Sequence, residues 1–108
     1  MPRLLAYWAY EFTHGVGVEP LGKALNGAGP WQWELREGSW YGHYLNCRPV
    51  PTVRVRIHEF EDPSPHLCVL LQIKAGSPAT QKEIDAQMRR ALAAAGVTGE
   101  LHEIEPYD

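Results

Sequence analysis

The chain has 108 residues, 44% of them hydrophobic, which suffices for one domain with a single apolar core and no stabilising metal or disulfide. Its formal net charge of −3 provides no basic footprint of the kind that nucleic-acid binders carry. No secretory segment and no apolar run of the ~20 residues that span a bilayer occurs. We therefore expect one cytoplasmic domain over residues 1–108, without membrane association.

The first predicted elements are a strand and a short helix. Residues 4–12 alternate between more hydrophobic even positions and mixed odd positions, which would place the two sets on opposite faces of a sheet. After a glycine-rich turn, Pro20 fits the first turn of a helix, where its missing N–H costs nothing. Leu21 and Leu25 give this helix an apolar stripe, and Asn26-Gly27 is expected to end it.

An aromatic segment over residues 29–49 carries three of the four tryptophans. Residues 31–36 alternate as a strand, and one set is expected in the core: Trp31, Trp33 and Leu35. A turn is expected at Glu37-Gly38-Ser39. Residues 40–47 then return either as a strand or as an irregular ribbon, because Gly42 weakens the case for regular pairing.

The second half of the chain predicts three strands and a helix. The strands are expected over residues 52–61, 67–73 and 101–104. The second of these is almost entirely apolar, so it should be central in the sheet. Thr80 and Glu83 have the spacing of a capping box, and Ile84, Met88 and Leu92 continue an apolar helical stripe. Gly96 is expected to stop this helix.

This order of elements favours an α+β fold, a two-layer sandwich with both helices on one face of an antiparallel sheet. The nearest named arrangement is a ferredoxin-like sheet with an extra hairpin. Such a sheet has a second face without helices, which we call the open face. Strand parity places these residues on it: Tyr7, Glu11, Arg54, Arg56, His58, Cys68, Leu70, Gln72 and Lys74.

We expect the open face and the second arm of the aromatic segment, residues 40–48, to bind a partner. Aromatic residues and arginine supply most interface hot spots. The candidate binding residues are Trp40, Tyr41, His43, Tyr44, Arg48, Arg54, Arg56 and His58. The alternative is an ordinary solvated sheet face with some exposed apolar atoms. If the residues bind, alanine at Trp40, Tyr44 or Arg56 should weaken partner binding without unfolding the domain.

Sites of catalysis and metal binding are weakly indicated. His43 and Cys47, and likewise His66 and Cys68, would each share one face of a strand, and two such pairs could together hold zinc. These spacings match no known zinc module, and free cysteine is usually a small buried hydrophobe, so we expect no metal, cofactor or catalytic residue. Arg48 could lower the pKa of Cys47. The sequence does not decide whether Cys47 and Cys68 form a disulfide.

Three functions are compatible with these features. The preferred one is a non-enzymatic protein-binding domain, such as an inhibitor, an adaptor or an immunity-type protein, whose partner is another protein. A homodimer is the other partner expected. The alternative is a small enzyme or ligand-binding protein of the dimeric α+β-barrel kind, by fold-level analogy, with a pocket near Trp33, His43, Asn46 and His58. Single-stranded nucleic acid on the sheet is the third, and the acidic balance of the chain weighs against it.

Overall fold

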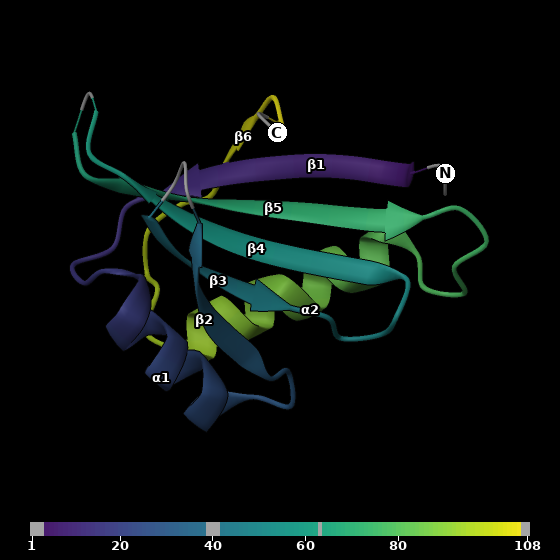
Figure 1. Cartoon of the computed structure of the whole chain (residues 1–108), viewed down its shortest axis with the longest axis horizontal. Helices are drawn as coiled ribbons and strands as arrows, with labels where there is room; N and C mark the ends of the chain where they lie inside the picture. The colour runs from purple at the N-terminus through teal and green to yellow at the C-terminus, as the bar shows by residue number, and fades with distance from the viewer. Residues whose placement is uncertain (1–3, 39–41, 63, 107–108) are drawn as a thin grey trace.

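A six-stranded antiparallel sheet with two helices packed on one of its faces makes up the described part of the chain (Figure 1). The computed structural model describes residues 4–38, 42–62 and 64–106. Its elements are β1 (Leu4–Phe12), α1 (Val18–Ala28), β2 (Trp33–Gly38), β3 (Gly42–Cys47), β4 (Val53–Phe60), β5 (His66–Lys74), α2 (Gln81–Ala94) and β6 (His102–Ile104). Neither described helix is long and apolar enough to cross a bilayer.

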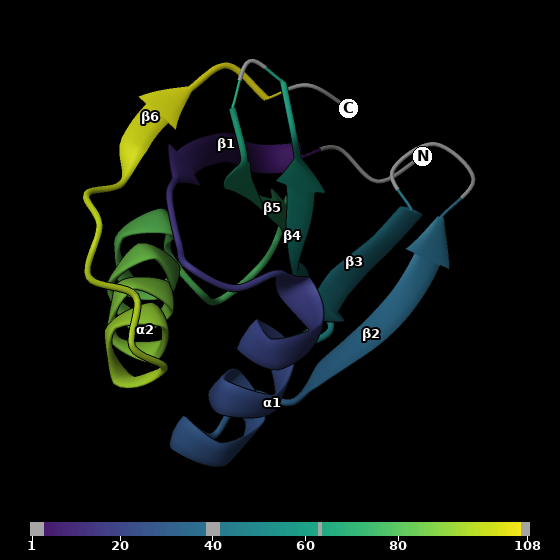
Figure 2. The same cartoon turned by 90° about the vertical axis from the view of Figure 1, so that its left-hand side faces the viewer.

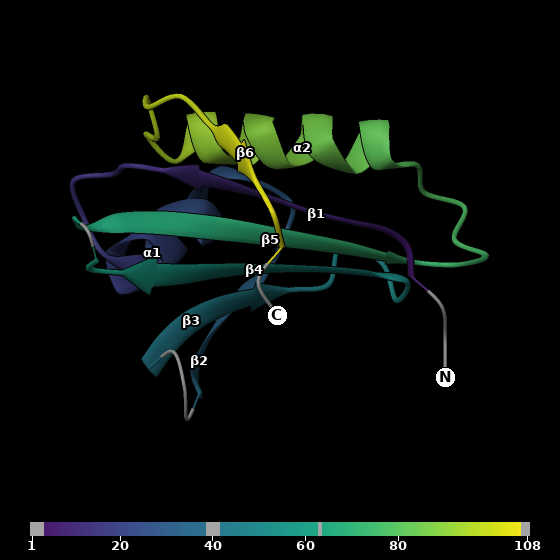
Figure 3. The same cartoon turned by 90° about the horizontal axis from the view of Figure 1, so that it is seen from above.

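The strands lie in the order β2-β3-β4-β5-β1-β6, and each is antiparallel to its neighbours. Figures 2 and 3 show both helices on one side of this curved sheet, with α1 beside β2, β3 and β4. The prediction of an α+β domain with both helices on one sheet face is confirmed. The strand order does not confirm the ferredoxin-like topology, because β2 and β3 extend the sheet beyond β4.

The core lies between the sheet and the helices, as the alternation of the strands predicts. Fully buried residues come from alternate positions of β4 and β5: Val53, Val55, Ile57, Leu67, Val69, Leu71 and Ile73. From α2, Ile84, Met88 and Leu92 pack against them. The strands begin and end within two residues of the predicted positions, which is the ordinary uncertainty of such boundaries.

The capping box of α2 is confirmed. Thr80 Oγ1 accepts a hydrogen bond from the Glu83 backbone N–H at 3.2 Å, and the Glu83 carboxylate accepts one from the Thr80 N–H at 3.2 Å. Two N–H groups that the first turn leaves without helical partners are thereby satisfied. Gly96 follows the helix with φ +94°, a left-handed conformation that favours glycine, so its predicted role as the helix stop is also confirmed.

Pro20 lies in the first turn of α1, as predicted. The helix begins at Val18, so Pro20 is its third residue, and its missing N–H falls among the groups without helical partners. The carboxylate of Glu59, on β4, accepts a hydrogen bond from the Val18 N–H at 2.9 Å. This cap comes from a distant strand and gives no local signal. The helix ends at Ala28, one residue beyond the predicted Asn26-Gly27 stop.

The first arm of the aromatic segment, residues 31–36, lies only partly in the core. Trp31 and Trp33 are buried, as predicted, with ring centroids 6.1 Å apart. The strand begins only at Trp33, whose backbone exchanges two hydrogen bonds with the side-chain amide of Asn26, at 3.0 and 2.7 Å. Leu35 is 43% exposed, so its predicted burial is wrong. Because β2 is an edge strand, Leu35 has a strand partner, Leu45, on one side only.

The second arm is a regular strand rather than an irregular ribbon. β2 and β3 pair without a break from Gly38 opposite Gly42 to Trp33 opposite Cys47. Gly42 has φ +66°, so the glycine that weakens the sequence pattern fits the start of this strand. Glu37 and Gly38 belong to β2, so the expected turn begins later. The rest of that prediction, Ser39, lies outside the described residues.

Candidate functional site

Six strands in continuous register place the side chains of the open face in rows. One row crosses all six strands of the described sheet, and we call it the ionisable row: Arg36, Tyr44, His58, Cys68, Glu11 and His102. The row beside it contains Glu34, Asn46, Arg56, Leu70, Ala9 and Ile104. The prediction that alternate residues of β1, β4 and β5 share the open face is therefore confirmed.

The centre of the open face is more buried than the sequence suggests. Asn46, Arg56 and His58 are the buried polar residues among those described, with exposed fractions of 2%, 7% and 1%. The Tyr44 ring stacks on His58, with centroids 5.0 Å apart and an interplanar angle of 20°. The alternative of an ordinary solvated sheet face does not hold at Arg56 and His58, because central strands surround them with side chains on both sides.

Four arginines gather toward the β2–β4 side of this face, and we call them the arginine cluster: Arg36, Arg48, Arg54 and Arg56. Burial first, and then the charge of neighbouring Arg56, lowers the pKa of Arg54. The charges of Arg48 and Arg36 act in the same direction. Arg54 Nε donates a hydrogen bond of 2.8 Å to Asn46 Oδ1, which orients the Arg54 side chain on the open face. The cluster is therefore a local concentration of positive charge.

The structure brings together part of the predicted binding set. Tyr44, Arg54, Arg56 and His58 share the open face, and exposed Arg48 directly follows β3. By its position in β3, His43 lies on the helix side of the sheet, where it is exposed. Its Nε2 lies 4.0 Å from the Glu37 carboxylate. Two further members of the set, Trp40 and Tyr41, lie outside the described residues.

The residues suggested for a barrel-type pocket lie on different faces. Trp33 is buried on the helix side, whereas Asn46 and His58 are buried on the open face. His43 is exposed at the start of β3. The four side chains therefore do not line one common pocket.

The sheet separates the two cysteines. Both are free and buried, but Cys47 belongs to the core on the helix side and Cys68 to the open face. The four-residue zinc set, which the sequence did not favour, therefore does not assemble. Burial raises the pKa of Cys47 to about 12, so Arg48 does not lower it, as the sequence allowed that it could. Burial, together with the charge of Glu11, raises the pKa of Cys68 to about 11.

One cluster escaped the sequence reasoning. Glu11, His66 and Cys68 each offer one metal-ligand atom, and the three atoms lie within 4.8 Å of one another. The shared parity of His66 and Cys68 is visible in the sequence. The third member comes from β1 through its pairing with β5, which no local pattern reveals.

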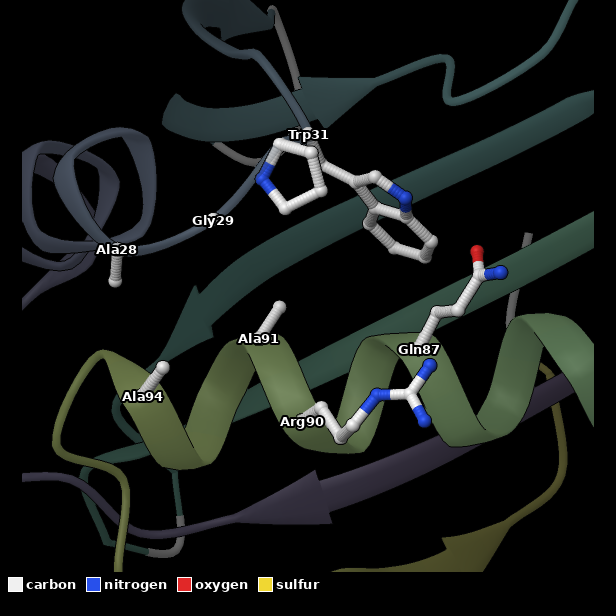
Figure 4. Close-up of a pocket in the computed structure, with 8 residues that line it drawn as sticks. Ala28, Gly29, Trp31, Gln87, Arg90, Ala91 and Ala94 are labelled. Atoms are coloured by element: carbon white, nitrogen blue, oxygen red, sulfur yellow. The ribbon is translucent and has the colours of Figure 1, made fainter.

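A separate groove of about 360 Å³ lies on the helix side, between the end of α1 and α2 (Figure 4). Trp31 forms one wall, and Gln87, Arg90 and Ala91 of α2 form the other. None of the candidate residues of the open face lines it. The groove and the open face are therefore separate surfaces.

No family model matches the chain, and no curated protein matches it. The function is therefore inferred from the geometry and the charge of the described residues.

Proposed function

We propose that this chain is a non-enzymatic protein-binding domain whose open face takes an acidic segment of a partner protein at the arginine cluster. The observation that supports the proposal is the gathering of four arginines on one patch of a chain whose net charge is −3. Like charges this close repel one another, and an anionic partner would relieve the repulsion. Inhibitors, adaptors and immunity-type proteins belong to this class.

The accessible part of the cluster suits carboxylates. The Arg36 side chain is 44% exposed, and Arg48 is also exposed. A guanidinium group donates two parallel hydrogen bonds to a carboxylate, which adds geometric specificity to the charge attraction. The stacked rings of Tyr44 and His58 provide a rigid aromatic floor next to these arginines.

A short acidic protein segment fits this face better than a nucleic acid. Glu34 pairs with Arg36 at 3.3 Å within the patch, and Glu11 lies farther along the ionisable row. A long phosphate backbone crossing the face would meet both carboxylates. The net charge of −3 would oppose it as well.

We also infer a ferredoxin-like topology with an extra hairpin, which suits the binding of a partner protein on the open face. In this proposal β4, β5, β1 and β6 with the two helices form a ferredoxin-like unit and β2 and β3 are the extra hairpin, which the position of β2 and β3 at one edge of the sheet supports. On this interpretation the hairpin enlarges the open face. It contributes Arg36 and Tyr44, two of the side chains that the proposed partner would contact.

Site-specific photo-crosslinking tests the proposed function. A photoreactive phenylalanine derivative replaces Arg48 in one variant and Arg90, exposed on α2, in a matched control. Expressed in the native cell, the first variant should form an adduct with one distinct protein, and the control should not. Adding Arg36→Glu and Arg54→Glu to the first variant should remove this adduct.

Four other outcomes contradict the proposal. Identical adducts from both positions, or none from either, would show that the open face is not a specific protein site. A self-adduct at position 48 would favour the homodimeric, barrel-type alternative. Crosslinking to nucleic acid would favour the third candidate function. Thermal unfolding of each variant confirms that the fold persists.

A further inference from the structure

A second cluster lies on the open face, on the opposite side from the arginine cluster. Glu11 of β1 stands directly across from Cys68 of β5, and His66 is two residues from Cys68 on the same face. One ligand atom from each lies within 4.8 Å of the other two. Carboxylate, imidazole and thiolate are the ligand types that zinc takes in proteins.

A hydrogen bond to the backbone sets the tautomer of the His66 ring. Its Nδ1 lies 2.7 Å from the backbone oxygen of Ser64. A carbonyl oxygen only accepts, so Nδ1 carries a hydrogen, and in the neutral ring Nε2 then has the lone pair that a metal needs. The ring also stacks on Phe60, with centroids 5.6 Å apart and an interplanar angle of 24°. A histidine that donates its second N–H to a carbonyl is typical of metal-bound imidazole.

A groove of about 280 Å³ leads to this cluster. Glu11 and His66 line it together with His102, which stands across from Glu11 on β6. Asp62, Ser64 and Glu100 complete the polar part of its wall. The groove supplies a path by which an ion can reach Glu11 and His66. Cys68 does not line the groove and is 3% exposed.

We propose that Glu11, His66 and Cys68 bind one Zn²⁺ ion, with His102 or water in the fourth position. A hard cation such as Mg²⁺ or Ca²⁺ prefers oxygen ligands throughout, whereas sulfur and nitrogen donors select a softer metal. The Cys68 thiol releases its proton to solvent as the Zn–S bond forms. The cation also offsets the repulsion between the thiolate and the Glu11 carboxylate. This site does not depend on the proposed function of the arginine cluster.

Cobalt serves as the spectroscopic probe, because Co²⁺ occupies zinc sites and a bound thiolate gives it a near-ultraviolet charge-transfer band. The reduced full-length chain should bind one Co²⁺ with this band. Zn²⁺ should then remove the band by competition. Cys47→Ser is the matched control and should keep the band, since Cys47 lies on the other side of the sheet. Cys68→Ser should abolish it.

Two further variants keep the test decisive even where Cys68→Ser fails to fold. His66→Ala and Glu11→Gln should each weaken Co²⁺ binding by at least about tenfold while circular dichroism remains unchanged. The proposal is overturned if the wild-type chain shows no charge-transfer band. It is equally overturned if Cys47→Ser loses the band, or if folded His66→Ala and Glu11→Gln bind Co²⁺ as tightly as the wild type.

Discussion

Asp85 links α2 to β1 of the sheet by side-chain hydrogen bonds. Its carboxylate accepts hydrogen bonds from Trp8 Nε1 at 3.1 Å, Tyr10 OH at 2.7 Å and Arg89 Nε at 2.8 Å. The Arg89 guanidinium also lies 4.7 Å from the centre of the Tyr10 ring. Burial acts to raise the pKa of Asp85, but the hydrogen bonds from these three side chains outweigh it and hold the pKa below its ordinary value. The ionised carboxylate therefore stabilises the fold.

Asp85→Asn should lower the free energy of unfolding at pH 7 by about 1–3 kcal/mol, because the hydrogen bonds lose their charged acceptor. The folded-state pKa lies below the unfolded one, so the charge contribution is complete above about pH 4 and is lost as the pH falls through the folded-state value. Urea unfolding of both proteins at pH 7 and at acidic pH measures the difference, which should shrink in acid.

A difference that stays constant with pH would show that Asp85 acts by packing alone. Glu105→Gln, at an exposed position, removes a carboxylate without these contacts and serves as the control.

The two thiols should be chemically inert in the native protein. Burial raises the pKa of Cys47 to about 12 and that of Cys68 to about 11, so little thiolate exists at pH 8. With metal removed by a chelator, iodoacetamide should alkylate each at least about 100-fold more slowly than a free cysteine, because thiolate is the nucleophile. Both should react at ordinary rates in urea. Mass spectrometry that finds rapid native labelling of either residue would contradict the burial.

At the scale of the element, a glycine lets α1 lie close to the sheet. A Cβ at Gly22 would stand 2.6 Å from Leu45 Cδ2, and Leu45 is only 1% exposed, so it has little room to move. Gly27 belongs to the same helix, but a Cβ there would meet nothing within 4 Å. The two positions therefore separate packing from helix propensity.

Gly22→Ala should destabilise the protein by about 1 kcal/mol, because overpacking costs about 1–3 kcal/mol and the gain in helix propensity returns about 1 kcal/mol. Gly27→Ala should stabilise it by up to about 1 kcal/mol through propensity. Urea unfolding of the two variants and the wild type measures both. Shifts of the same sign would mean that the contact with Leu45 does not decide the effect.

The elements that the sequence predicts well are those with a local pattern. Alternation identifies β1 and β4, the apolar run places β5 at the centre, and the capping box marks the start of α2. The elements predicted less well depend on distant partners. Glu59 caps α1 from β4, and Asn26 sets the start of β2 through the backbone of Trp33.

The candidate site divides in the same way. Parity along single strands places Arg54, Arg56 and His58 on one face, which the structure confirms. The burial of His58 and the approach of Glu11 to Cys68 require knowledge of which strands pair and in what register. Register is fixed by the whole sheet, so these features appear only once the strand order is known.

For the whole molecule, the distribution of charge matters more than its total. Thirteen acidic and ten basic side chains give the net −3, yet four of the ten basic ones form the arginine cluster. Glu11, on β1, lies toward the opposite end of the open face from the arginine cluster. The groove beside Arg90 lies on the helix side of the sheet. A partner that is attracted by this distribution should bind less tightly as salt screens the charges.

The affinity of the partner captured at position 48 measures the central claim most directly. Its Kd is determined for the wild type, Arg54→Glu and Arg90→Glu at low and at physiological salt. Arg54→Glu should weaken binding at least about tenfold, or about 1.4 kcal/mol, and reduce the salt dependence. Arg90→Glu, the same change of charge on the helix side, should stay within about twofold of the wild type. Equal losses in the two variants, or a loss in Arg90→Glu alone, would contradict binding at the open face.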